Sequence, residues 1–300
     1  MTVRVRHPSR PRHPTVQNGR MGDALEAEEA GPAPVGPADD HAALDAVLWD
    51  PIAFGVLVRT RPRFEEVVLD AGCGDGATAL PTAELVGPSG RVDAIDPDEG
   101  LVALVRDRAS DRMPQLHPFV GDLADRDPGE YDLVQCALGL RRLAAGDVDR
   151  LDDVVRALVS QARPGGRVAI AVWAGGSFDP LPEVLGGALA PEYGGDEDAA
   201  ELAASARPSL PGAETPGAFA HRLAGLGLSG VRADVVPLHL ELDDELAWRL
   251  VTGTTLRALL EDLDDDGVER VRTRALAAIA DRSIASVDAS VLVAVGRRPV

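Results

Sequence analysis

The chain has 300 residues, 45% of them hydrophobic and 26% charged, which is typical of a globular protein with a sizeable core. Its formal net charge of -19 disfavours binding to nucleic acids or anionic membranes, because both rely on clustered cations in the protein. All 30 basic residues are arginine, which excludes Schiff-base chemistry and the phosphate-binding lysine of Walker-type nucleotide sites.

The N-terminal part divides into two segments. Residues 1–38 are rich in Pro, Gly, Arg and Glu without apolar periodicity, so we expect a disordered tail that buries too little apolar surface to fold. This tail does not resemble a signal peptide, no later stretch approaches a membrane span, and Cys73 and Cys136 are too few for a disulfide framework. A cytoplasmic protein is therefore predicted. Residues 39–66 have apolar positions at roughly helical spacing, interrupted at Pro51, which predicts a broken helical cap that covers the site.

Residues 67–300 are predicted to form one α/β domain, because apolar runs alternate with helix-like segments after residue 66. The apolar runs lie at residues 67–69, 92–95, 116–120, 133–136 and 168–172, and the helix-like segments at 78–86, 100–109 and 147–162. This alternation is typical of a parallel sheet with helices on both faces.

The C-terminal half carries two predicted insertions, at about residues 174–214 and 243–285. Between and after them lie a predicted helix at 215–226 and predicted strands at 231–242 and 289–295. Helical periodicity continues through residues 243–281. We expect the insertions to form a lid, because active-site variation in open α/β folds accumulates in loops at the strand ends.

The first predicted strand runs into a glycine-rich turn, VVLDAGCGDG at residues 67–76. Asp70 is followed by Gly72, Gly74 and Gly76, and glycines let the backbone turn sharply and approach a ligand closely. The next strand ends at Asp96, where a carboxylate can accept hydrogen bonds from a ribose diol. This combination predicts a nucleoside-containing cofactor. The spacing also satisfies the G-x-G-x-x-A pattern of dinucleotide sites, so the glycines alone leave NAD and S-adenosylmethionine open.

Residues 67–173 resemble the class I S-adenosylmethionine-dependent methyltransferases, in particular the ubiquinone and menaquinone group. Residues 70–76 match the D-x-G-x-G-x-G motif of that family, and Asp96 matches the acid that holds the ribose hydroxyls. The segments GDL at 121–123, YDLVQCALGL at 131–140 and ARPGGRVAIAVW at 162–173 resemble its adenine-binding segment, fourth strand and fifth strand. The resemblance implies a Rossmann-like, seven-stranded sheet that ends in an antiparallel pair. The cofactor-binding residues that it implies are Asp70, Ala71, Gly72, Gly74, Gly76, Asp96, Asp122, Leu123 and Ala137.

The resemblance implies S-adenosylmethionine-dependent methyl transfer to a small organic acceptor, at oxygen, nitrogen or carbon, in quinone or specialised metabolism. Two alternatives stay open. One is a non-methylating protein of this fold that binds the cofactor and serves as a cyclase, regulator or partner subunit. The other is a nicotinamide-dependent oxidoreductase. We expect a small-molecule partner without nucleic acid or membrane, and a homodimer is allowed.

The chain departs from the family after the fourth strand, where many relatives have a histidine pair and this chain has Arg141 and Arg142. We interpret these arginines as solvated side chains at a helix start, and the alternative is that one of them binds an acidic acceptor. The candidate general bases are Asp179, Glu183 and His221, and the sequence does not choose among them. His239, within a predicted strand, and His41, ahead of the N-terminal helix, are less favoured.

The remaining predictions concern aromatic, acidic and cysteine residues. Aromatic residues expected near the acceptor are Trp49, Phe54, Phe178 and Trp248. Asp262, Asp264, Asp266 and Gly267 match the first half of an EF-hand calcium loop, but Thr273 stands where the bidentate glutamate belongs. No metal is therefore predicted. Cys73 and Cys136 are expected to pack as small apolar side chains near the cofactor loops.

Overall fold

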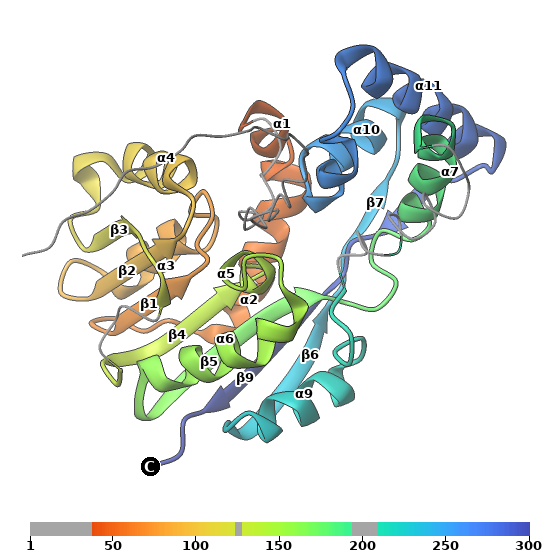
Figure 1. Ribbon diagram of the computed structural model, residues 1–300. Helices are drawn as coiled ribbons and strands as arrows, with labels where there is room; N and C mark the ends of the chain where they lie inside the picture. The colour runs from red at the N-terminus through yellow and green to blue at the C-terminus, as the bar shows by residue number, and fades with distance from the viewer. Residues whose placement is uncertain (1–37, 124–127, 194–203, 205–208) are drawn as a thin grey trace, which may run out of the picture. The chain divides into compact units, whose positions relative to one another are not determined.

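The computed structural model describes residues 38–123, 128–193, 204 and 209–300 (Figure 1). The tail predicted for residues 1–38 lies outside this part except for its last residue. Within the described ranges, a seven-stranded sheet has the order β3-β2-β1-β4-β5-β9-β6. Its strands are β1 (Val67–Ala71), β2 (Arg91–Asp96), β3 (Leu116–Val120), β4 (Tyr131–Ala137), β5 (Ala162–Trp173), β6 (Ser229–Val236) and β9 (Val291–Arg297).

The first five strands are parallel, and β9 runs antiparallel between β5 and β6. This confirms the seven-stranded sheet with an antiparallel pair at its end. The prediction of one strand over residues 231–242 was wrong. Pro237, which has no N–H to donate to a ladder, follows β6, and the chain then leaves the main sheet. There β7 (His239–Glu241) pairs with β8 (Ser286–Asp288), a short strand that the sequence pattern did not predict.

Alternating side chains along the strands divide the core between the two faces of the sheet. Leu69 and Ile170 pack with α6 (Leu151–Gln161) and α9 (Pro216–Gly225) on one face. Their neighbours Val68 and Ala169 pack on the other face, against α3 (Ala79–Val86) and α4 (Glu99–Ala109). The structure therefore confirms helices on both faces (Figure 1).

The N-terminal cap consists of α1 (Ala38–Ala42), a π-helical turn η1 (Asp45–Trp49) and α2 (Asp50–Thr60). Pro51 lies in the first turn of α2, where its missing N–H has no partner to lose, so the irregular turn comes just before it. Gly55 lets α2 approach β6, because an added Cβ would lie 2.4 Å from Val236 Cγ1. At the other end of α2, the buried Arg167 donates to the carbonyls of Thr60 and Arg61.

The two insertions meet in a helical lid beyond the sheet. Its helices are α7 (Leu181–Tyr193), α10 (Asp244–Thr252), the 3-10 helix η5 (Thr255–Leu260) and α11 (Asp265–Asp281). Figure 1 shows α7, α10 and α11 grouped together, away from α3 and α4. The carboxylate of Glu192 on α7 accepts hydrogen bonds from Arg270 (2.7 Å) and Arg274 (2.5 Å) on α11. The apolar faces of the lid helices form one core cluster with α2 and the ends of β5 and β9.

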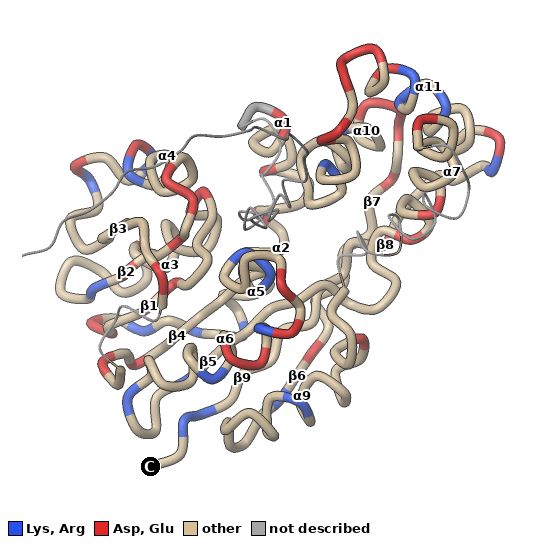
Figure 2. Tube along the Cα trace, viewed as in Figure 1, with Lys and Arg blue, Asp and Glu red and all other residues tan. Residues whose placement is uncertain are grey.

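Acidic residues gather on the loop that leads into α11, as Figure 2 shows. Asp264 in this loop caps α11, because its Oδ1 accepts from the N–H of Gly267 at 2.8 Å. The match to half of an EF-hand loop is thus also the pattern of a helix cap.

The short helices elsewhere in the described ranges are η2 (Ser110–Arg112), α5 (Leu140–Leu143) and η4 (Val148–Arg150). Among the described helices, none is long and apolar enough to cross a membrane.

Candidate functional site

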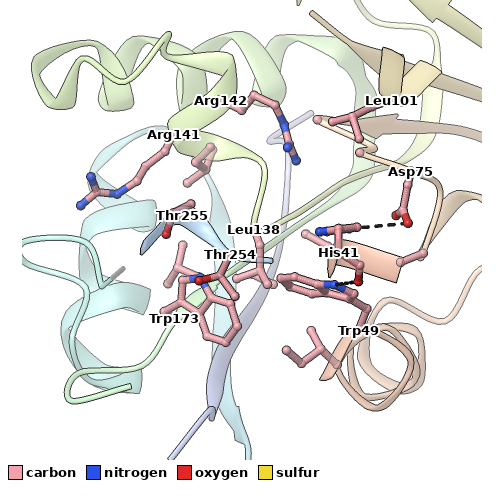
Figure 3. A pocket seen from close by; sticks show the side chains of 18 of the residues that line it. His41, Trp49, Asp75, Leu101, Leu138, Arg141, Arg142, Trp173, Thr254 and Thr255 are labelled. Carbon is pink, nitrogen blue, oxygen red and sulfur yellow. Dashed lines mark hydrogen bonds and ion pairs between the residues drawn. The ribbon is translucent and has the colours of Figure 1, made fainter. Parts of the chain in front are cut away.

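A cavity of about 500 Å³ lies at the carboxyl ends of β1, β4 and β5 (Figure 3). Its lining includes the glycine-rich loop after β1, the turn after β4, the end of β5, the N-terminal cap, the first turn of α4 and the lid at and around η5. This is the edge at which parallel α/β sheets bind their ligands. The cavity therefore joins the sequence motif to the cap and the lid.

The glycine-rich loop has the left-handed backbone conformation that its glycines permit. The φ angles are 66° at Gly72, 56° at Gly74 and 97° at Gly76. Gly72 also lies against the turn after β4, because an added Cβ would come within 2.8 Å of the Cα of Gly139. The N–H groups of Gly72 and Cys73 both donate to the carbonyl of Ile95, at 2.8 and 3.1 Å. Backbone contacts thus hold the loop between β2 and β4.

The buried carboxyl of Asp70 supports this loop through hydrogen bonds. Its side chain is fully buried, and its Oδ2 accepts hydrogen bonds from Thr78 Oγ1 (2.7 Å) and Gln135 Nε2 (2.8 Å). Burial raises the pKa of this carboxyl to about 6, although the two hydrogen bonds partly oppose the shift. Asp70 and Ala71 do not line the cavity, so their place in the family motif corresponds to loop geometry.

Asp96, at the end of β2, is completely buried beside the loop. Its Oδ2 accepts from the N–H of Gly74 at 2.9 Å, and its Oδ1 accepts from the N–H of Asp98 at 3.1 Å. Arg142 Nε lies 3.1 Å from Oδ2 and forms an ion pair with it. The guanidinium thus lies on the carboxylate that the sequence assigned to the ribose.

The other predicted cofactor residues lie at different distances from the cavity. Gly72, Gly74 and Ala137 line it, whereas Gly76 packs against Leu80 and does not. After β3, Asp122 is exposed and Leu123 packs in the core beneath α6. The cavity also includes Leu101 and Leu140, which the sequence analysis missed. Leu101 could have been found from its position, because the first turn of the helix after Asp96 must face the same ligand edge.

The side of the cavity away from the loop is mainly apolar. Trp49 and Trp173 face it with their ring centroids 6.3 Å apart, and Leu138 lies beside them (Figure 3). Of the four aromatic residues expected here, Trp49 alone lines the cavity. Phe178 is buried behind Trp173, and the side chain of Phe54 points into solvent from α2. Trp248 lies beside Arg272 in the lid.

His41 reaches the cavity from the cap and contacts both the loop and the lid (Figure 3). Its Nε2 lies 3.5 Å from Asp75 Oδ2, and its Nδ1 lies 3.2 Å from the carbonyl oxygen of Gly253. Asp75 is also paired with Arg108 Nη1 at 2.8 Å. Burial alone would raise the pKa of Asp75, but the hydrogen bond and charge of His41 and the charge of Arg108 outweigh it and hold the pKa below its usual range.

The two arginines after β4 both line the cavity, so the interpretation of them as solvated side chains was wrong. Arg142 is paired with Asp96, as described above. Burial lowers the pKa of Arg141, whose Nη2 donates a long hydrogen bond of 3.4 Å to the carbonyl of Ser209. Their place at the start of a short helix is predicted from the sequence. Their burial follows from the close approach of this turn to the glycine-rich loop, which Gly139 allows.

The three candidate bases from the sequence lie outside the cavity lining. Glu183 is exposed on α7, where its carboxylate pairs with Arg282 at 2.8 Å. His221 is exposed on α9, which packs beside α6 on the face of the sheet opposite to α3 and α4. Asp179 precedes α7, and its N–H donates to the carbonyl of Gly176. The structure brings none of these three side chains to the glycine-rich loop.

The two cysteines are buried as free thiols near the loop. Burial raises the pKa of Cys136 to about 12 and that of Cys73 well above its ordinary value. Protonated thiols are poor nucleophiles and pack as small apolar groups. Among the described residues, no group of three or more His, Cys, Asp or Glu side chains could hold a metal ion.

Comparison with known proteins relates this site to one family. Residues 68–166 match a family described as a methyltransferase domain. Nocamycin O-methyltransferase of Saccharothrix syringae is 32% identical over 218 residues, which cover 69% of this chain and 71% of that protein. The ubiquinone/menaquinone biosynthesis C-methyltransferase UbiE of Pseudomonas entomophila is 34% identical over 107 residues, 34% of this chain and 40% of that enzyme.

A solved structure shows the same fold at low sequence identity. The YcgJ protein of Bacillus subtilis superposes with a TM-score of 0.52 at 14% identity, over 83% of this chain and 98% of that one. The residues around the cavity also fit the cofactor of the family, because a Cβ added at Gly74 would meet nothing closer than Arg142 Nη2 at 3.4 Å. The loop is therefore open toward the cavity beside Asp96. Motif, fold and relatives agree that the chain belongs to the class I S-adenosylmethionine-dependent methyltransferases, with S-adenosylmethionine as its cofactor.

Proposed function

We propose that this enzyme transfers a methyl group to an oxygen atom of a small, largely apolar organic acceptor. The observation that carries the proposal is the cavity itself, which runs without interruption from the glycine-rich loop to a wall of Trp49, Trp173 and Leu138. Such a wall binds apolar rings and chains, and the few polar groups within it orient the acceptor.

Within this proposal, the cofactor lies along the loop side of the cavity. The backbone of Gly72 and Gly74 holds its methionine part, and Asp96 accepts from the ribose hydroxyls. Asp122 serves the adenine end, as the family motif implies, and Leu101 adds an apolar wall. The contact between Arg142 and Asp96 must then open for the ribose, because Asp96 is completely buried.

S-adenosylmethionine supplies a methyl group on a positively charged sulfur, which is already a good leaving group. The protein's task is therefore to hold the acceptor atom close to that carbon and to exclude water. The cap and the lid are suited to both tasks. Trp49 comes from the cap, Thr254 and Leu259 come from the lid, and all three line the acceptor side of the cavity.

Oxygen is favoured over carbon as the methylated atom because the match covers a larger share of the O-methyltransferase than of the C-methyltransferase. The match to nocamycin O-methyltransferase covers 71% of that protein, whereas the match to UbiE covers 40% of it. A match over most of both chains includes parts that bind the acceptor, and a shorter one need not. We accordingly expect a hydroxyl or enol acceptor in specialised metabolism.

The test is a screen with methyl-radiolabelled S-adenosylmethionine against phenols, enols, quinols, amines and carboxylic acids. We expect label transfer to hydroxyl or enol compounds, with the new methyl group assigned to oxygen by NMR. Transfer to carbon or nitrogen instead would contradict the choice of oxygen. If calorimetry shows that the cofactor binds but no class accepts the label, the non-methylating alternative is the better description.

A further inference from the structure

We propose that Arg142 binds the carboxylate on the methionine part of the cofactor, and that it leaves Asp96 to do so when the ribose hydroxyls bind there. This inference rests on the proposed position of the cofactor along the glycine-rich loop and not on the nature of the acceptor. Arg141 and Arg142 follow one another in α5, yet their side chains point in different directions (Figure 3). The guanidinium of Arg142 is the one that lies against Asp96 and the loop.

This guanidinium lies between the two halves of the proposed cofactor site. Its Nε is 3.1 Å from Asp96 Oδ2, at the ribose end. Its Nη2 is 3.4 Å from the position that a Cβ on Gly74 would take, which is over the loop that faces the methionine part. Arg142 is therefore close to both ends without a change in the backbone.

Asp96 keeps hydrogen-bond donors when Arg142 leaves it. The backbone N–H groups of Gly74 and Asp98 donate to its two oxygens, at 2.9 and 3.1 Å. The contact with Arg142 is an ion pair, because among the described residues no acceptor has hydrogen-bonding geometry with its Nε, although this atom is buried. Ribose hydroxyls are good donors, so they can replace the guanidinium at this carboxylate.

Arg142, in contrast, needs another anion once it has left Asp96. Its side chain is only 21% exposed, and a charge that loses its partner in such surroundings is strongly destabilising. The acidic residues of the described cavity lining are Asp75 and Asp262. Asp75 is already paired with Arg108 at 2.8 Å, and Asp262 follows η5 on the lid side. The cofactor itself brings one carboxylate, on its methionine part.

An arginine is well suited to this carboxylate. Its planar guanidinium presents paired N–H donors that match the two oxygens of a carboxylate, which gives a strong, charge-assisted contact. The exchange of partners also makes Arg142 a specificity-determining residue. A nucleoside without the carboxylate must break the pair between Arg142 and Asp96 and offers the guanidinium no new partner. The site therefore selects the intact cofactor over its nucleoside fragments.

The test compares two ligands by isothermal titration calorimetry. One is S-adenosylhomocysteine, and the other is its decarboxylated analogue, which keeps the amine and lacks only the carboxylate. Arg142→Gln should lower the affinity for S-adenosylhomocysteine about tenfold or more, because a charge-assisted contact is lost. It should leave the affinity for the analogue unchanged or raise it, because the guanidinium no longer competes with the ribose for Asp96.

Two further variants guard against a general loss of structure. Arg142→Lys keeps a positive charge, so it should retain part of the preference for the ligand with the carboxylate. Arg156→Gln is the matched control, because Arg156 is exposed on α6, where it pairs with Asp153 at 2.8 Å. It should leave the affinity for both ligands at the wild-type value.

The outcomes separate the role of Arg142 from the position of the cofactor. If Arg142→Gln changes both affinities by the same factor, in either direction, Arg142 does not bind the carboxylate, and the proposed position of the cofactor still stands. If Asp96→Asn leaves the affinity for S-adenosylhomocysteine unchanged, the proposed position fails and the role of Arg142 fails with it.

Discussion

The two sides of the cavity are built in different ways. On the loop side, backbone conformation makes the site: positive φ angles at Gly72 and Gly74, and their N–H groups facing β2. On the cap and lid side, the site consists of side chains such as His41, Trp49 and Trp173, which come from distant parts of the chain. Backbone groups can bind a cofactor that a whole family shares, whereas side chains must bind an acceptor that is particular to one enzyme.

The largest expected effect is at Gly72. Gly72→Ala combines a strained φ of 66° with a Cβ at 2.8 Å from the backbone of Gly139, so the loop must move. We expect affinity for S-adenosylmethionine to fall by about 100-fold or more, measured by isothermal titration calorimetry. The matched control is Gly187→Ala on α7, where nothing lies within 4 Å of the added Cβ. Equal affinities in the two variants would remove the distinction between the two sides.

The next effect concerns pH and stability at Asp70. Its pKa of about 6 lies above the ordinary 3.8, so the folded protein holds this proton more tightly than the unfolded chain. The resulting stability is fully present at acidic pH and is lost as pH rises toward about 6. The side chain of Asp70→Asn stays neutral at every pH. Its free energy of unfolding should therefore fall by up to about 3 kcal/mol less than that of the wild type over this pH range. Urea unfolding of both proteins at several pH values measures the difference, and parallel curves would contradict the prediction.

A smaller effect is expected at Asp96. Asp96→Asn keeps the shape of the side chain but removes the charge that faces Gly74 N–H and Arg142, so cofactor affinity should fall about tenfold. Asp93→Asn on the same strand is the control, since that carboxylate is bonded to Tyr131 and not to the loop. It should affect stability without changing the calorimetric Kd. A stronger affinity in Asp96→Asn would show that the carboxylate does not serve the ribose.

The smallest effect is expected in the lid at Glu183. This carboxylate pairs with Arg282 on an exposed surface and does not line the cavity. Glu183→Gln should leave kcat and both KM values unchanged and should alter the free energy of unfolding by less than about 1 kcal/mol. Steady-state kinetics and thermal unfolding check this. A large loss of kcat would return Glu183 to the list of candidate bases.

The sequence alone determined the sheet, the cofactor loop and the family, because each is encoded in local patterns. Strands and helices follow from the periodicity of apolar residues, and the turn at residues 70–76 needs glycines at fixed positions. The same local reading failed where a residue's surroundings decide its role. Pro237 ended a strand that periodicity continued, and Arg141 and Arg142 turned inward because Gly139 brings their turn against the loop.

Only the tertiary structure decided the acceptor side of the site. His41, Asp75 and Gly253 are brought together from the cap, the loop and the lid, and nothing in their spacing along the chain predicts the contact. Asp179, Glu183 and His221 were reasonable candidates by their position after strands, yet the lid and α9 carry them away from the cavity. The physical reason is that strand ends converge by topology, whereas the direction of an insertion is set by which apolar faces it buries.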